Sequence, residues 1–352
     1  MEKTNNTEQL LELISRPSFS VQNGKITHAN APARERQLLP GMTVKELLLT
    51  GVEEYEAFQS GCLYLTVSCA GIPWGATVTK MDSYLLFLLD QDNSTSALQA
   101  MSLAAMHMRR PLSEIMAAAE SLSPYQRKSE EAARIDQGTY SLLRMIRNME
   151  DVSHYMSSIC PMKLHSIGDV IAETVEHAAA LAAQAGKKIV FVPLQETVYS
   201  MAEPERLKRA VYNLLSNALH ATPNAGTIEV CLKKNGKTLY FSVLDGGTGI
   251  PAQLQGNLFT AFMREPALND GYSGLGLGMS VVRAAAASHH GAVLVDFPKE
   301  TGTRVTITLP IRQSTDNTVR TPILTIDSFG GYDQGLIELA DVLPVSVFQK
   351  YR

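Results

Sequence analysis

Apolar residues recur at alternating spacings of three and four in two stretches of the chain. This spacing is typical of a heptad seam and predicts two amphipathic helices. The seam positions are Leu98, Met101, Ala105, Met108, Leu112, Ile115, Ala119 and Leu122, and then Ile135, Gly138, Leu142, Met145, Met149, Val152 and Met156. Ser123 and Pro124 break the pattern between the helices, which predicts an antiparallel hairpin. Because one hairpin has too little core to stand alone, we expect two copies to pair as a four-helix bundle.

A different pattern fills the first ninety residues or so. Asn23 and Gly24 separate two short β-forming runs, which is a strong signal for a β-hairpin. The pattern predicts helices over 8–15, 44–49 and 52–60 and, after them, strands over 62–69, 74–80 and 84–89. Two strands, small helices and three more strands is an order of elements that resembles a PAS sensor domain. An unrelated small α+β module is the alternative.

Helical segments alternate with β-rich runs from residue 166 to residue 310, which predicts an α/β sandwich. The expected helices are 170–184, 203–221 and 279–288, and the expected strands are 189–192, 227–232, 238–245, 292–297 and 304–309. The last forty residues are predicted to hold a strand over 323–326, a turn at Gly330 and Gly331 and a helix over 336–342. The pattern assigns no role to that C-terminal stretch.

Composition narrows the function classes. The 352 residues suggest two or three domains, and with 45% hydrophobic residues, 19% charged residues and a net charge of -4 the chain is an ordinary globular protein. Because no basic patch stands out, we do not expect a nucleic-acid partner. No apolar stretch approaches the ~20 residues that cross a bilayer, and the polar Met1–Thr7 has no signal-peptide character. We therefore expect a cytoplasmic protein without a membrane span.

Two segments between residues 166 and 310 carry residues suited to binding a metal ion and a purine. Asn213 and Asn217 share one helical face, where two amide oxygens can hold a hydrated Mg²⁺ that bridges phosphates. Asp245 leaves a strand into a turn with Gly247 and Gly249. A carboxylate there can accept from a purine amine, and the glycines let the base approach the backbone.

Two further segments follow in the chain. Phe259 and Phe262 predict an aromatic clamp beneath a loop, with Arg264 as a phosphate contact. The fourth segment opens a helix whose backbone N–H groups can cradle an anion, and it contains Gly274, Leu275, Gly276 and Leu277. Each segment alone also has a purely structural explanation, such as a surface amide pair or a tight turn. Their order along the chain is what indicates a nucleotide site.

In this order the segments resemble the N, G1, F and G2 boxes of the ATP-binding domain that histidine kinases share with type II topoisomerases, heat-shock chaperones and mismatch-repair proteins, the GHKL type. The resemblance extends to Thr303 before the last strand and implies ATP and Mg²⁺ as cofactors. His220 stands where kinases often carry Lys or Arg, which implies a weaker phosphate contact. Hydrolysing members have a Glu general base where this chain has Asn213, and an amide cannot deprotonate water. The hairpin upstream makes the sensor histidine kinases the similar branch.

The resemblance implies a multidomain α+β fold with four parts. These are a PAS-like sensor domain over 8–92, a dimerisation and histidine-phosphotransfer hairpin over 93–160, an ATP-binding domain over 166–312 and a C-terminal extension over 313–352. It also implies a homodimer that phosphorylates its own histidine, a response-regulator receiver domain as partner, and an unidentified ligand or partner for the sensor domain.

The acceptor region departs from the family pattern. A Pro normally follows the acceptor His by five residues, whereas here Pro111 follows His107 by four. The acidic base that follows the acceptor would fall at His107 or Met108. Three hypotheses stay open: a kinase with His107 as acceptor and Asn213 in its catalytic site, a degenerate kinase that acts as a nucleotide-binding dimeric scaffold, and a His107 that is only an exposed helix residue. The four boxes argue against a sensor that binds no ATP.

Overall fold

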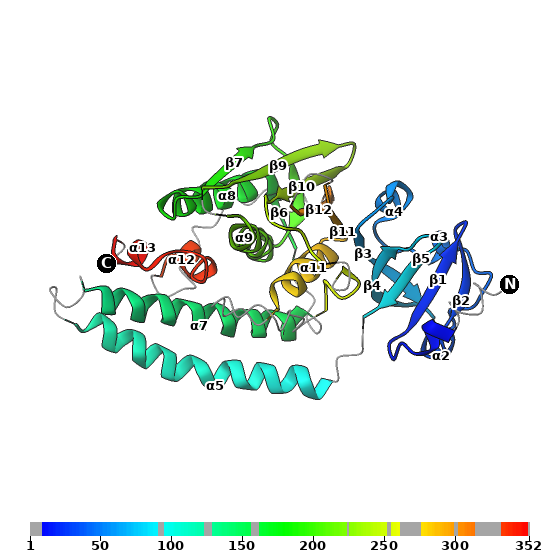
Figure 1. Cartoon of the computed structure of the whole chain (residues 1–352), viewed down its shortest axis with the longest axis horizontal. Helices are drawn as coiled ribbons and strands as arrows, with labels where there is room; N and C mark the ends of the chain where they lie inside the picture. Colours follow the sequence, from blue (N-terminus) through cyan, green and yellow to red (C-terminus); the bar gives the residue numbers. More distant parts are fainter. Residues whose placement is uncertain are drawn as a thin grey trace.

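The structure is a computed structural model that describes residues 9–90, 95–122, 129–155, 162–223, 225–251, 255–260, 276–298, 302–313 and 332–350 (Figure 1). It confirms the predicted multidomain α+β fold class. A sheet region, a long helical hairpin and an α/β region follow one another along the chain, and a short helical segment ends the described part. Within the described residues, no helix combines the length and apolar character needed to cross a bilayer.

The N-terminal region is an antiparallel sheet with strand order β2-β1-β5-β4-β3. Asn23 and Gly24 join the first two strands with φ values of 50° and 74°, which confirms the predicted hairpin. The elements are β1 (Ser18–Gln22), β2 (Lys25–Ala29), α2 (Ala31–Glu35), α3 (Val44–Leu47), α4 (Val52–Ala57), β3 (Cys62–Cys69), β4 (Ile72–Lys80) and β5 (Leu85–Leu89). Only α2 was not predicted; it begins at Asn30, whose side chain accepts from Ala33 N.

Helices α5 (Thr95–Glu120) and α7 (Glu130–Tyr155) form the predicted hairpin. Their contact buries Ala105, Leu112, Met116 and Ile146. Of the predicted seam, Ala105 and Leu112 are buried in this contact, whereas Met108 and Ile115 are each 48% exposed in the single chain; Met116, outside that seam, is also buried. Two packed helices bury only a narrow stripe of each, so the rest of the apolar seam stays uncovered in a single chain.

The α/β region is a sandwich, as predicted, with strand order β11-β12-β10-β9-β7 and helices on one face (Figure 1). Its elements are α8 (Ile167–Gln184), β7 (Lys188–Val192), α9 (Pro204–Ala221), β9 (Thr227–Asn235), β10 (Thr238–Leu244), α11 (Gly278–Ser288), β11 (Val293–Asp296) and β12 (Arg304–Pro310). Two strands that the pattern missed, β6 (Lys163–Ser166) and β8 (Tyr199–Ala202), pair with each other. This region is called the ATPase region below.

The two sheets are continuous, because β3 pairs with β11 in antiparallel register. The result is one ten-stranded sheet. Gly61 makes the approach possible: its φ is +84°, and a Cβ there would lie 2.0 Å from Val295 O. At the rim of this junction, Arg283 Nη1 lies 2.5 Å from Asp90 Oδ1, and the Tyr64 hydroxyl donates to Asp90 Oδ2 at 2.8 Å.

The C-terminal segment, residues 332–350, forms α12 (Gln334–Glu338) and α13 (Val345–Lys350). Figure 1 shows α12 between α7 and α9. The helix predicted over 336–342 corresponds to α12, which begins and ends earlier than expected, and α13 was not predicted. The strand predicted over 323–326 and the turn at Gly330 and Gly331 lie outside the described residues.

Candidate nucleotide site

Helix α9 presents the asparagine pair. It begins at Pro204, and the side chain of the N-cap residue Glu203 accepts from Arg206 N. Asn213 is fully buried and its Nδ2 donates to Arg209 O at 2.8 Å, which fixes the orientation of the amide. In the described part of the chain, Asn213 Oδ1 has no hydrogen-bond partner. This acceptor is therefore available to a ligand, an ion or a water.

Gly278, the first residue of α11, faces that amide oxygen. A Cβ at Gly278 would lie 3.0 Å from Asn213 Oδ1 and 3.8 Å from Asn217 Oδ1. Both oxygens therefore point to the N-terminal end of α11, where the helix dipole favours an anion. Gly276 turns the chain into this helix with a φ of +69°, and Leu277 is buried. Of the predicted cradle, Gly274 and Leu275 lie outside the described residues.

Asp245 is held rigidly just after β10. Its Oδ1 accepts from Gly247 N at 2.9 Å and from Thr303 N at 3.1 Å, and its own N–H donates to Thr303 O at 3.0 Å. Both side-chain bonds fall on Oδ1, which leaves Oδ2 for a donor on a ligand. Burial raises the pKa of the Asp245 carboxyl, and the two backbone donors lower it only in part. Gly302 must be glycine, because a Cβ would lie 1.9 Å from Asp245 O.

The asparagine pair and the turn that follows Asp245 meet along α9. A Cβ at Gly247 would lie 2.9 Å from both Ala221 Cβ and Ala221 O, so the turn after Asp245 rests on the last residue of the helix that carries Asn213 and Asn217. His220, next to it, is exposed. Gly249 has a φ of +78° in the same turn. Sequence reasoning did not single out Gly278 or Ala221; the third glycine of the G-x-G-x-G run was the available signal for Gly278.

Phe259 is buried rather than open to a ligand. Its ring lies 5.3 Å from the ring of Tyr64, a residue of β3, and Ser280 Oγ donates to Phe259 O at 3.4 Å. Phe262 and Arg264, the other residues of the predicted clamp, lie outside the described residues. The described part of this segment thus contacts the N-terminal sheet region.

His107 is exposed on α5. Pro111 lies in the same helix and has no N–H, so the His107 carbonyl loses its helical donor. Near this level the ATPase region reaches α5 through Met101, which packs with Leu277 and Val281. His107 points about 120° around the helix axis from Met101. In Figure 1, α7 lies between α5 and the ATPase region.

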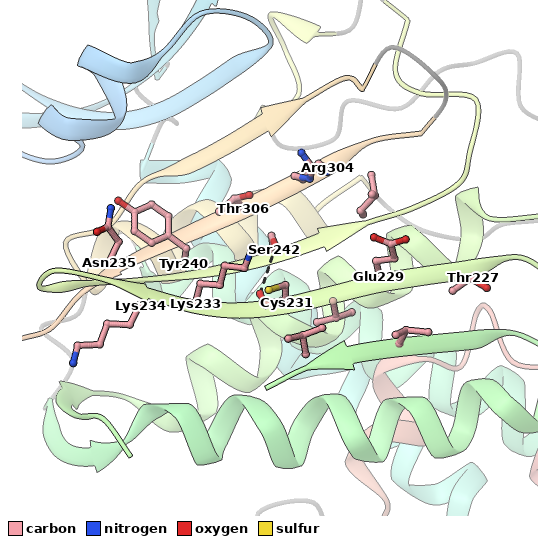
Figure 2. A pocket seen from close by; sticks show the side chains of 14 residues that line it. Thr227, Glu229, Cys231, Lys233, Lys234, Asn235, Tyr240, Ser242, Arg304 and Thr306 are labelled. Atoms are coloured by element: carbon pink, nitrogen blue, oxygen red, sulfur yellow. Dashed lines mark hydrogen bonds between the residues drawn. The ribbon is translucent and has the colours of Figure 1, made fainter. Parts of the chain in front are cut away.

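An open hollow of about 810 Å³ lies on the outer face of the ATPase sheet (Figure 2). Strands β7, β9, β10 and β12 form it, with Glu229, Lys233 and Arg304 among the side chains that line it. None of the predicted nucleotide residues lines this hollow. It is therefore separate from the candidate site on α9.

Comparison with known proteins agrees with this geometry. Residues 202–313 match the family described as "Histidine kinase-, DNA gyrase B-, and HSP90-like ATPase". The adaptive-response sensory kinase SasA of Synechococcus sp. (strain CC9311) is 34% identical over 125 residues, which are 35% of this chain and 33% of that protein. The sensor protein kinase PmrB of Pseudomonas aeruginosa is 32% identical over 169 residues, which are 43% of this chain and 34% of that protein.

Among solved structures, full-length ShkA in complex with AMPPNP has a TM-score of 0.49 and 21% identity, over 61% of this chain and 46% of that one. The chain spans about a third of the length of the two kinases above. Every described residue of the candidate nucleotide site lies inside the segment that matches the ATPase family. Residues 202–313 thus belong to this ATPase family, and the chain is similar to sensor histidine kinases.

Proposed function

We propose that this chain binds ATP with Mg²⁺ between α9, α11 and the turn after β10, and that it transfers the γ-phosphoryl group to His107. One observation carries the nucleotide site: the oxygens of Asn213 and Asn217 face the glycine that opens α11, and Asn213 Oδ1 is buried without a partner in the described part of the chain.

The residues fit a hydrated Mg²⁺. The ion prefers oxygen ligands and keeps several waters, so the amide oxygens of Asn217 and Asn213 suit it better than a closed cage would. When bound, the ion supplies positive charge beside the phosphates. Asp245 Oδ2 would accept from the adenine amine, and the N–H groups at the start of α11 would hold the phosphates.

In the transfer itself, a ring nitrogen of His107 would attack the γ-phosphorus. The N–P bond forms as the P–O bond to ADP breaks, and the ring gives up one proton to solvent, since Met108 and not an acid follows the histidine. Positioning is the protein's main contribution to such a reaction. Because His107 faces away from the nucleotide residues, the transfer needs a different arrangement of hairpin and ATPase region or a site in a second subunit.

A homodimer is part of this proposal. Met108, Ile115, Ile135 and Leu142 are apolar hairpin residues that are 46–48% exposed in the single chain. Covering them with the same face of another hairpin would complete a four-helix bundle. Replacing Ile115 and Leu142 with Lys should give monomers by light scattering, while Ser113→Lys, at an exposed residue outside the seam, should not. A dimer of unchanged strength in the double variant would contradict the bundle.

Similarity to sensor histidine kinases supports the remaining steps. The phosphoryl group would pass from His107 to an aspartate of a response-regulator receiver domain, and the N-terminal sheet region would act as a PAS-like sensor for a ligand or partner. The protein would work in the cytoplasm.

Calorimetry with ATP and Mg²⁺ tests the nucleotide site. Asp245→Asn should weaken binding strongly, because the amide cannot offer the same acceptor to the adenine amine. Asp169→Asn, at an exposed carboxylate of the same region, is the matched control and should bind normally. Equal affinity in the two variants would remove Asp245 from the site.

Labelling with γ-labelled ATP tests the acceptor. A kinase should gain an acid-labile, base-stable phosphoryl group that His107→Gln abolishes without changing ATP affinity. The competing function is a dimeric scaffold that binds nucleotide and transfers nothing. It is favoured by Met108 at an expected acid position and by the orientation of His107. Binding without label would support the scaffold, and label that persists in His107→Gln would move the acceptor elsewhere.

A further inference from the structure

One carboxylate of the C-terminal segment joins two other regions. Glu338 is fully buried, and its Oε1 lies 2.8 Å from Arg209 Nη1 on α9 and 3.2 Å from Arg147 Nη1 on α7. An arginine of the hairpin and an arginine of the ATPase region therefore share one counter-ion from residues 332–350. A buried charge needs such a partner, because leaving it unpaired is costly.

A second buried pair lies further along the segment. Arg144 on α7 and Asp341 are 2.9 Å apart, with side chains 4% and 3% exposed. Gln137, two helical turns earlier on α7, donates to Ala340 O at 3.1 Å and to Leu343 O at 2.8 Å. Apolar contacts surround these polar ones, and the segment contributes Leu336, Leu339, Ala340, Leu343, Val347 and Phe348 to the core of the ATPase region.

The same network touches the candidate nucleotide site. Arg209 Nη2 donates to Asn148 Oδ1 at 2.7 Å, and its Nε pairs with Asp151, so this one side chain binds both the hairpin and the C-terminal segment. Its carbonyl accepts from Asn213. The contact between hairpin, C-terminal segment and ATPase region is thus one helical turn from the asparagine that faces Gly278.

We propose that residues 332–350 act as a clamp that holds α7 against α9, and that releasing the clamp frees the ATPase region to approach His107. The contacts of Glu338, Asp341 and Arg209 support the clamp between α7 and α9. The effect of its release rests on the proposed kinase function, because only a phosphoryl transfer requires the two regions to rearrange.

Hydrogen exchange of the full chain tests the clamp. Arg144→Glu sets two negative charges against each other at residue 341, and it should raise exchange about tenfold or more in 332–350 and along the facing parts of α7 and α9. Adding Asp341→Arg reverses the pair and should restore protection. Arg134→Glu, which breaks an exposed pair on the same helix, is the matched control and should change neither segment.

Hydrogen exchange in strands β1 to β5 reports whether each variant folds. Asp341→Asn is a milder variant to use where Arg144→Glu does not fold. Unchanged exchange in 332–350, or release of 332–350 without any change along α7 and α9, would overturn the clamp.

Phosphohistidine formation in the same variants separates this proposal from the kinase function. Release should raise the labelling rate, and the reversed pair should bring the rate back. A labelling rate that stays the same when exchange shows release would overturn the regulatory half. No label in any variant would count against the kinase function, and the exchange result would still decide the clamp.

Discussion

The ATPase region has two neighbours in the chain, and it contacts them by different means. Toward the N-terminal sheet region it uses backbone hydrogen bonds, since β3 and β11 pair in register and Gly61 lets the strands approach. Toward the hairpin it uses the buried side chain of Arg209, which pairs with Asp151 of α7 and also with Glu338 of residues 332–350.

The difference bears on which contact can open. A strand ladder persists through most side-chain changes, because its hydrogen bonds belong to the backbone. A buried ion network is sensitive to every member, because loss of one partner leaves the charge of another unpaired. We infer that the junction between β3 and β11 is the fixed one and that the hairpin junction is the releasable one.

The strongest way to break the hairpin junction is Glu338→Ala. It removes the carboxylate that Arg147 and Arg209 share, and breaking a buried pair costs ~3–5 kcal/mol. Denaturant unfolding of the full chain measures the loss. Glu130→Ala, which breaks the exposed pair with Arg134, should cost ~0–1 kcal/mol. Similar losses in the two variants would show that the network does not hold the junction.

Gly61→Ala should open the junction between β3 and β11, with a somewhat smaller loss in the free energy of unfolding. Alanine at a left-handed backbone position costs ~1–2 kcal/mol of stability. The clash with Val295 O costs roughly 1 kcal/mol more for each hydrogen bond of the strand ladder that is lost. Gly71→Ala is the matched control, because its φ of +81° is similar and a Cβ there meets nothing within 4 Å. Hydrogen exchange in β3 and β11 should rise in Gly61→Ala alone. Equal exchange in both variants would mean that strain, not the clash, is what matters.

The smallest expected effect depends on pH. His177 Nε2 lies 3.1 Å from Asp333 Oδ2, and this hydrogen bond raises the pKa of His177 above its ordinary 6.5. The pKa of Asp333 falls below its ordinary 3.8 because its hydrogen bonds, chiefly the one from His177, outweigh the effect of burial. The pair should thus be intact between pH 3.8 and 6.5. It should weaken as the pH rises through the raised pKa of His177, or falls through the lowered pKa of Asp333.

For such a partly exposed pair the contribution should be ~0.2–1 kcal/mol. Tyr212, whose hydroxyl is 3.0 Å from His177 Nδ1, has a raised pKa and stays neutral across this range. The Tm difference between wild type and His177→Gln, measured from pH 5 to pH 8, should shrink with rising pH. A difference that is constant with pH would rule out the charged pair.

The sequence predicted the elements whose signals are local. Asn23 and Gly24 specify their turn by backbone preference, and β3 has the bounds that its β-forming residues predicted. Asn213 and Asn217 were paired correctly on one face, since helical spacing alone decides it. The short strands β6 and β8 were missed because four residues carry too little pattern.

The C-terminal segment could not be interpreted in the same way. Glu338 and Asp341 have the polarity of surface residues, yet both are buried, because their partners lie 129 and 197 positions away in the chain. Met108 and Ile115 were assigned to the core of a bundle of two hairpins, and in the single chain they are each 48% exposed. In each case the missing information was a contact between distant segments.

The shared sheet has a consequence for how the protein can be divided. In the intact chain, β3 and β11 cover each other's edges, and Val293 and Val295 are fully buried. A fragment that ended before β11, or one that began after β5, would expose an apolar strand edge with unpaired backbone groups. Such edges recruit other strands and cause aggregation. Soluble expression of the separate pieces should therefore need a charged residue or a proline introduced on the freed strand.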